Sequence, residues 1–133
     1  MSYRRTTYRY ARVRTGPTWP FDGAWESEQW RLLVRARWRP DADIYETRNT
    51  VEMIVDLAGV DDEDIEVQLF DDAIVIEGRR RLPSCGEEAV YHAAGIRQGP
   101  FRVELPLPTP IDAEHVEARY ERGLLHVTLP KPA

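Results

Sequence analysis

Apolar and polar residues alternate along most of the chain after residue 40, and this period of two predicts β-strands. Near the C-terminus the alternation covers residues 116–121, breaks at Arg122-Gly123, and resumes over residues 125–129. Glycine takes the positive φ of a tight reversal without steric cost, and Pro130 ends the pairing because it has no amide hydrogen. The stretch predicts a hairpin with one apolar face, which needs a second layer to be stable.

Five more segments show the same alternation, bounded by turn residues such as glycine, proline and aspartate. They cover residues 43–47, 51–57, 65–70, 73–77 and 101–107. No convincing helix lies between them, so the sequence predicts an all-β, two-layer sandwich of about seven strands. Residues 82–98 form an unusually long loop, and a loop of this length in a compact domain usually serves function or assembly.

The chain has 133 residues, enough for one domain with a real core. No apolar run is long enough to cross a bilayer, and the N-terminal residues lead into no apolar segment, so we expect no secretory signal. Cys85 is the only cysteine, which excludes an intramolecular disulfide. A cytoplasmic location is the simplest expectation.

Charge and aromatic residues divide the chain into two parts with different compositions. Residues 1–39 carry nine arginines against three acidic residues, a net charge of +6, together with every tryptophan. Residues 40–133 carry nine cations against twenty acidic residues, a net charge of −11. We therefore expect an arm at 1–39, the sandwich at 40–131 and a short end at 132–133, with different roles for arm and sandwich.

The arm has no sustained strand pattern over residues 1–20, which favours disorder or a conformation set by a partner. Residues 24–38 predict a helix that Asp22 could cap and the Arg39-Pro40 pair could end. Three roles remain open for this helix. It could pack on its own domain or another subunit, hold unfolded polypeptide, or bind nucleic acid or membrane through arginine and aromatic residues.

The chain carries no pattern that predicts catalysis. His92, His115 and His126 lie on separate segments without metal-ligand spacing, and Asp61–Asp64 lacks the spacing of a calcium loop. Cys85 is followed by Glu87-Glu88, which disfavour its thiolate, and no nucleophile elbow or phosphate-binding loop is present. We expect no enzyme activity, no cofactor and no metal.

Several short motifs resemble those of the α-crystallin-type small heat-shock proteins. Residues 118–125, Ala-x-x-x-Arg-Gly-Leu-Leu, are similar to the family's A-x-x-x-n-G-v-L signature. Further similar pieces occur in the family's order: Pro40–Glu46, Leu57-Ala58-Gly59-Val60, Gly78-Arg79, Gly99-Pro100-Phe101 and Leu107-Pro108. The likeness spans about residues 38–131.

The resemblance implies an immunoglobulin-like sandwich, the α-crystallin domain, and an ATP-independent holding chaperone built from dimers. In the bacterial and plant branch, a strand in the long loop crosses to the partner's first strand. The residues of this chain at the exchanged strand are Val90, Tyr91 and His92, and those at its receiver are Ile44 and Tyr45. Such an exchange covers two exposed strand edges at once.

The resemblance also implies an apolar groove between two strands, in which the family's C-terminal I-x-I/V tail docks. The groove residues of this chain are Ile65, Val67, Leu69, Val116 and Ala118. The sequence ends at Ala133 without that motif. We expect a homodimer or a small oligomer, unless the arm replaces the tail or a tailed relative supplies one.

As a chaperone, the protein would take unfolded or partly unfolded proteins as partners, without nucleic acid or membrane. The predicted client contacts lie in the arm: Trp19, Phe21, Trp25, Trp30, Leu33 and Trp38. The alternative function is a non-chaperone adaptor dimer that recognises one specific folded partner, because fold alone does not settle function.

Overall fold

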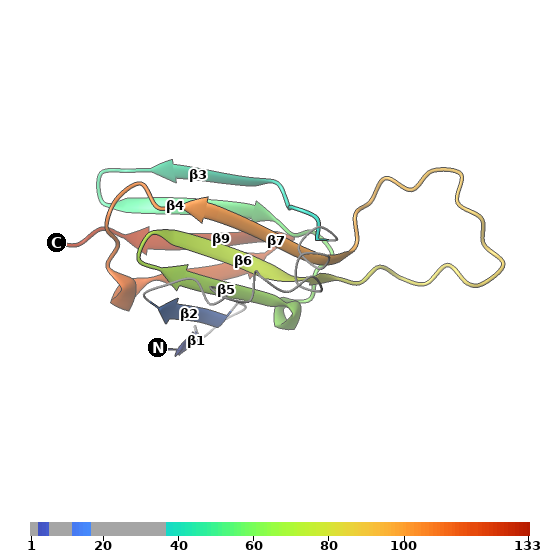
Figure 1. Ribbon diagram of the computed structural model, residues 1–133, viewed down its shortest axis with the longest axis horizontal. Helices are drawn as coiled ribbons and strands as arrows, with labels where there is room; N and C mark the ends of the chain where they lie inside the picture. Colours follow the sequence, from blue (N-terminus) through green and yellow to red (C-terminus); the bar gives the residue numbers. More distant parts are fainter. Residues whose placement is uncertain (1–2, 6–11, 17–36) are drawn as a thin grey trace, which may run out of the picture.

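Two β-sheets pack face to face in the computed structural model, which describes residues 3–5, 12–16 and 37–133 (Figure 1). Sheet A has the strand order β1-β2-β5-β6-β7, and sheet B has the order β3-β4-β9-β8. The strands of sheet A are β1 (Tyr3–Arg5), β2 (Arg12–Gly16), β5 (Ile65–Phe70), β6 (Ala73–Arg80) and β7 (Gly99–Pro106). Those of sheet B are β3 (Ala42–Glu46), β4 (Thr50–Asp56), β8 (Glu117–Glu121) and β9 (Leu124–Pro130).

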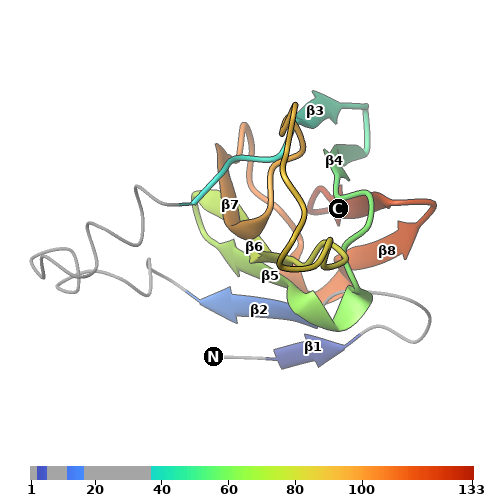
Figure 2. The same cartoon turned by 90° about the vertical axis from the view of Figure 1, so that its right-hand side faces the viewer.

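The core fills the space between the sheets with alternate residues of each strand, as period-two burial requires. Figure 2 shows the two layers edge-on, with β5 and β8 near one edge and β7 and β3 near the other. The largest fully buried side chains are Phe101, Met53, Leu57, Ile74, Ile76, Leu125 and Leu129. These residues are the apolar half of each alternating pattern.

Apart from the long loop between β6 and β7, short connections join the strands of residues 37–133, and two of these connections contain a 3₁₀ turn, η2 (Asp62–Asp64) and η3 (Ala113–His115). Arg122 and Gly123 both have positive φ in the terminal hairpin, at 55° and 79°. The Gly123 carbonyl accepts a hydrogen bond from the Leu57 amide at 2.8 Å. A Cβ at Gly123 would lie 2.8 Å from the Ala58 Cα, so the hairpin depends on glycine for both its turn and its close packing.

The structure confirms the all-β sandwich predicted from the alternation. All seven predicted strands are present, with ends shifted by a few residues. Two strands were not anticipated, because β1 and β2 lie in the segment expected to be without strand structure. The predicted helix 24–38 falls mostly outside the described residues, and its end is wrong: Trp38 forms an extended, parallel bridge with Phe101.

Candidate interaction surfaces

The five predicted groove residues lie together in the core, at the edge where β5 and β8 face each other. All five are at most 4% exposed. The outer edge of β5 is paired with β2 in parallel register, with Val13 opposite Val67 and Thr15 opposite Leu69 (Figure 2). A strand from the arm, β2, therefore occupies the outer edge of β5 next to these buried residues. Whether the groove binds other segments stays a prediction.

The two predicted dimer surfaces lack strand partners among the described residues. Strand β3 pairs with β4 on one side only. The loop between β6 and β7 extends away from the sandwich, and no residue of 81–98 is assigned to a strand (Figure 1). Within that loop, Val90 is 77% exposed and Tyr91 63% exposed. Tyr45 on β3 is also exposed, so both surfaces present apolar groups to solvent.

Trp38 is the one predicted client contact within the described residues, and it is held against the sandwich. Its indole N–H donates to the Gly99 carbonyl at 3.1 Å, and its ring lies 5.5 Å from that of Phe101. The Arg80 guanidinium lies over the Trp38 ring, 4.3 Å from its centre. These contacts fit an anchor for the arm better than a surface for clients. Trp19, Phe21, Trp25, Trp30 and Leu33 lie outside the described residues.

Arg80 joins the arm anchor to the base of the long loop. Its Nε donates to the Arg97 carbonyl at 2.8 Å, and its Nη1 donates to the Ala58 carbonyl at 3.2 Å. The sequence analysis assigned no role to Arg80. A missed signal was the register: Arg80 pairs with Gly99, so its side chain lies on the same face of β6 as the core residues Ile74 and Ile76.

The outer face of sheet B carries a polar cluster that the sequence did not reveal. Glu52 is only 9% exposed, and its Oε1 accepts a hydrogen bond from Thr128 Oγ1 at 2.9 Å and lies 3.0 Å from His126 Nε2. Glu52 pairs with Thr128 across β4 and β9. Since every polar atom named here has a partner, the cluster reads as cross-strand stabilisation.

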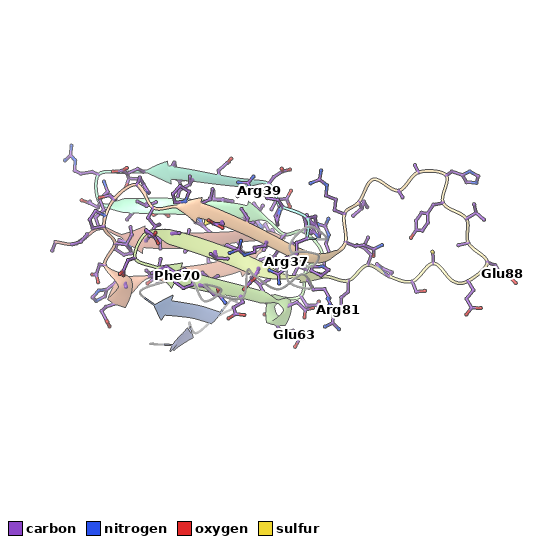
Figure 3. All side chains as sticks on the ribbon, viewed as in Figure 1. Arg37, Arg39, Glu63, Phe70, Arg81 and Glu88 are labelled. Atoms are coloured by element: carbon purple, nitrogen blue, oxygen red, sulfur yellow. The ribbon has the colours of Figure 1, made fainter. Side chains whose placement is uncertain are left out.

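A polar cleft of about 580 Å³ lies beside η2 and the end of β6. Figure 3 shows Arg37, Glu63 and Arg81 around it. Its lining is charged, and Arg81 pairs with Asp64 at 3.3 Å. No group of three potential metal ligands occurs within residues 3–5, 12–16 and 37–133. In the same described part of the chain, no helix is long and apolar enough to cross a membrane.

Cys85 lies exposed in the long loop, where its thiol lies 3.5 Å from the Tyr91 hydroxyl. This hydrogen bond raises the pKa of Tyr91 above its ordinary value of 10.0. Since a neutral phenol keeps its proton at physiological pH, the contact supplies no acid or base chemistry. It links two positions within the loop and leaves the Tyr91 ring accessible.

Glu77 lies on the outer face of sheet A between two arginines, 3.0 Å from Arg37 Nη1 and 3.9 Å from Arg102 Nε. Burial raises the pKa of Glu77 above its ordinary value of 4.5, although both arginines act to lower it. The folded chain therefore binds this proton more tightly than the unfolded chain. The contribution of Glu77 to stability is greatest below pH 4.5 and is lost as the pH rises through the raised folded value.

We expect the free energy of unfolding to have a smaller negative slope with pH in Glu77→Gln than in the wild type, over the interval just above pH 4.5. Glutamine keeps the shape of the protonated side chain but cannot titrate there. Urea unfolding at a series of pH values measures the slope. Equal slopes for the two proteins would show that Glu77 is not the group responsible.

The paired sheets, the strand connectivity and the long loop before β7 define an α-crystallin-type domain. The chain belongs to the Hsp20/alpha crystallin family, whose sequence model matches residues 43–133. The small heat shock protein C2 of Rickettsia felis is 32% identical over 92 residues, covering 69% of this chain and 60% of that protein. A probable 15 kDa heat shock protein of Leptospira interrogans is 30% identical over 106 residues, covering 80% of this chain and 78% of that protein.

Solved structures of the family give the same result. Heat shock protein 16.0 from Schizosaccharomyces pombe superimposes with a TM-score of 0.66 at 33% identity, over 71% of this chain and 88% of that one. The hspA protein from Xanthomonas axonopodis gives a TM-score of 0.65 at 33% identity, over 71% and 95% of the two chains. The family model covers β4 to β9 and nearly all of β3, so the family assignment rests on strands of both sheets.

Proposed function

We propose that this protein is an ATP-independent holding chaperone that binds partly unfolded proteins and prevents their aggregation. The observation that carries the proposal is the match of residues 43–133 to the Hsp20/alpha crystallin family, together with similar relatives that are named heat shock proteins. The composition supports it, since an arm with four tryptophans and nine arginines precedes an acidic domain. The net negative charge of the domain would keep its complex with an aggregation-prone client in solution.

The energetics favour several weak contacts over one strong site. Burial of one large apolar side chain of a client contributes about 1.5–3 kcal/mol, which association costs alone can cancel. Several such contacts on arms linked through a dimer act at high effective concentration, so they hold a client without nucleotide. Trp19, Phe21, Trp25, Trp30 and Leu33 are the proposed contacts, and Trp38 is the anchor that positions them.

We also propose that the working unit is a homodimer formed by exchange of Val90–His92 onto the β3 edge of a second copy. The β3 edge and the exposed loop are complementary. The β3 edge offers backbone groups that no strand pairs with on its outer side, and the loop offers a segment with exposed apolar side chains that could pair with it. Neither surface is satisfied by the described residues of a single chain. A dimer would satisfy both.

The function is tested by heating an aggregation-prone enzyme with the protein, without ATP, while light scattering is recorded. We expect the wild type to suppress scattering, and a variant carrying Trp19→Ser, Trp25→Ser and Trp30→Ser to lose most of that protection. Leu124→Ser is the matched control, because it removes a large apolar side chain that is 46% exposed on the sandwich itself. Protection of only one of several unrelated enzymes would favour the adaptor function instead.

A further inference from the structure

Arg80 lies at the neck of the long loop, which we define as Arg80 on the outgoing strand and residues 97–99 on the returning one. In the β6–β7 ladder Arg80 is opposite Gly99, and this is the last pair before the loop. The guanidinium reaches farther, since Nε and Nη2 both donate to the Arg97 carbonyl, Nε at 2.8 Å. A side chain of β6 therefore holds the returning chain beyond the end of the backbone ladder.

Trp38 holds the same returning chain at its next residues. Its indole N–H donates to the Gly99 carbonyl at 3.1 Å, and its backbone is hydrogen-bonded to Pro100 and Arg102. Its ring also stacks under the Arg80 guanidinium, an arrangement that attracts a cation to the face of an indole. Trp38 thus fixes both the returning chain and the direction of the Arg80 side chain.

A further contact of Arg80 reaches the other sheet. Its Nη1 donates to the Ala58 carbonyl at 3.2 Å, in the turn that follows β4. Two residues before Ala58, the Asp56 amide donates to the Asp41 carbonyl at 2.9 Å, where β3 begins to pair with β4. The loop neck and the β3 edge are therefore tied to the same short stretch at the end of β4.

The relative direction of the loop and the β3 edge decides how an exchange can close. In a closed dimer each chain gives one loop and receives another, so the angle between its own loop and its own β3 edge must match the two-fold axis. A loop that swings freely costs more to order and also allows open chains. Figure 3 shows Glu88 at the far end of the loop, away from the sandwich, so a small turn at the neck moves the exchanged segment a long way.

Given the proposed exchange dimer, on which this inference rests, we propose that Arg80 fixes the direction of the long loop relative to the β3 edge of the same chain and thereby selects the closed dimer. Arginine suits this role because its planar guanidinium donates from three nitrogens in fixed directions and stacks on an aromatic ring. Lysine has the same charge, but its single ammonium group cannot hold the Arg97 and Ala58 carbonyls in that geometry.

Association is measured by sedimentation equilibrium of Arg80→Lys over a concentration series. We expect its dimer dissociation constant to rise about tenfold over that of the wild type, because the loop loses its preset direction. The matched control is Arg79→Lys, the same change at the neighbouring residue, whose side chain is exposed on the opposite face of β6. Its constant should stay within about twofold of the wild type. Equal constants for the two variants would overturn the proposal.

A disulfide across the neck separates the role of Arg80 in the loop from a general loss of packing. Arg81→Cys and Gln98→Cys place thiols at the next pair beyond Arg80 and Gly99, a spacing that a disulfide accepts. With Arg80→Lys and Cys85→Ser in the same chain, we expect the oxidised protein to recover the wild-type dissociation constant and the reduced protein to remain weak. Equal constants in the two states would show that Arg80 does not act through the neck, and would overturn the proposal.

A wild type that is monomeric at every concentration would refute the exchange dimer, and hydrogen exchange then tests the neck by itself. We expect the amides of residues 97–99 to exchange about tenfold faster in Arg80→Lys than in Arg79→Lys. Equal rates would overturn the role of Arg80 in the neck. Faster exchange in Arg80→Lys beside a monomeric wild type would support that role and refute only the dimer.

Discussion

Gly78→Ala should lower the free energy of unfolding by about 3 kcal/mol or more, an effect at the upper end of those seen for overpacked cores. A Cβ at this position would lie 1.9 Å from the Asp64 carbonyl oxygen and 2.8 Å from Phe101 Cζ. The first contact is with backbone, which cannot rotate away. Relief therefore requires η2 to move away from β6 and the Phe101 ring to leave its place in the core.

The matched control is Gly95→Ala, in the long loop. A Cβ there would meet nothing within 4 Å, and the residue does not have positive φ. Its substitution removes the same backbone freedom without a clash, so we expect stability close to that of the wild type or slightly above it. Urea unfolding of both variants measures the difference. Equal midpoints for the two would mean that the Asp64 turn shifts at little cost.

Gly78 also illustrates which features of the fold could be predicted from the sequence and which could not. The alternation of apolar and polar residues predicted the strands β5 and β6 and their buried faces. A strand that is buried on one face has an apolar residue at every second position. It could not show that the Phe101 ring lies against Gly78, since that contact depends on register between β6 and β7. The motif likeness marked Gly78 as characteristic, and the structure supplies the physical reason.

In the arm, local sequence patterns did not predict the secondary structure correctly. The sequence predicted a helix over residues 24–38, but Trp38 forms a β-bridge with Phe101 and is hydrogen-bonded beside β7. A tertiary partner decided the conformation there, and no local pattern records a partner that lies about sixty residues away in sequence. Likewise, Arg12–Gly16 has too little alternation to predict a strand. It becomes one because β5 offers it an unpaired edge.

Dimer formation gives the second large expected effect. Replacement of Val90 and Tyr91 by proline should convert a dimeric protein to a monomer, because proline removes the amide donors that an exchanged strand would use. The segment is exposed and forms no strand within one chain, so the sandwich itself should fold unchanged. Sedimentation equilibrium over a concentration series measures the mass, and circular dichroism confirms the sheet content.

The loop offers a control with the same chemistry outside the proposed strand. The control is Ser84→Pro together with Ala94→Pro, which introduces prolines on either side of residues 90–92. Gly86→Ala is unsuitable as a control because Gly86 has positive φ. These two changes stiffen the loop but leave the donors of the exchanged segment in place, so the dimer should persist. A Val90→Pro/Tyr91→Pro protein that remains dimeric would show that the subunits associate through another surface. In that case the exposed Val90 and Tyr91 side chains and the β3 edge would have to be explained by other partners.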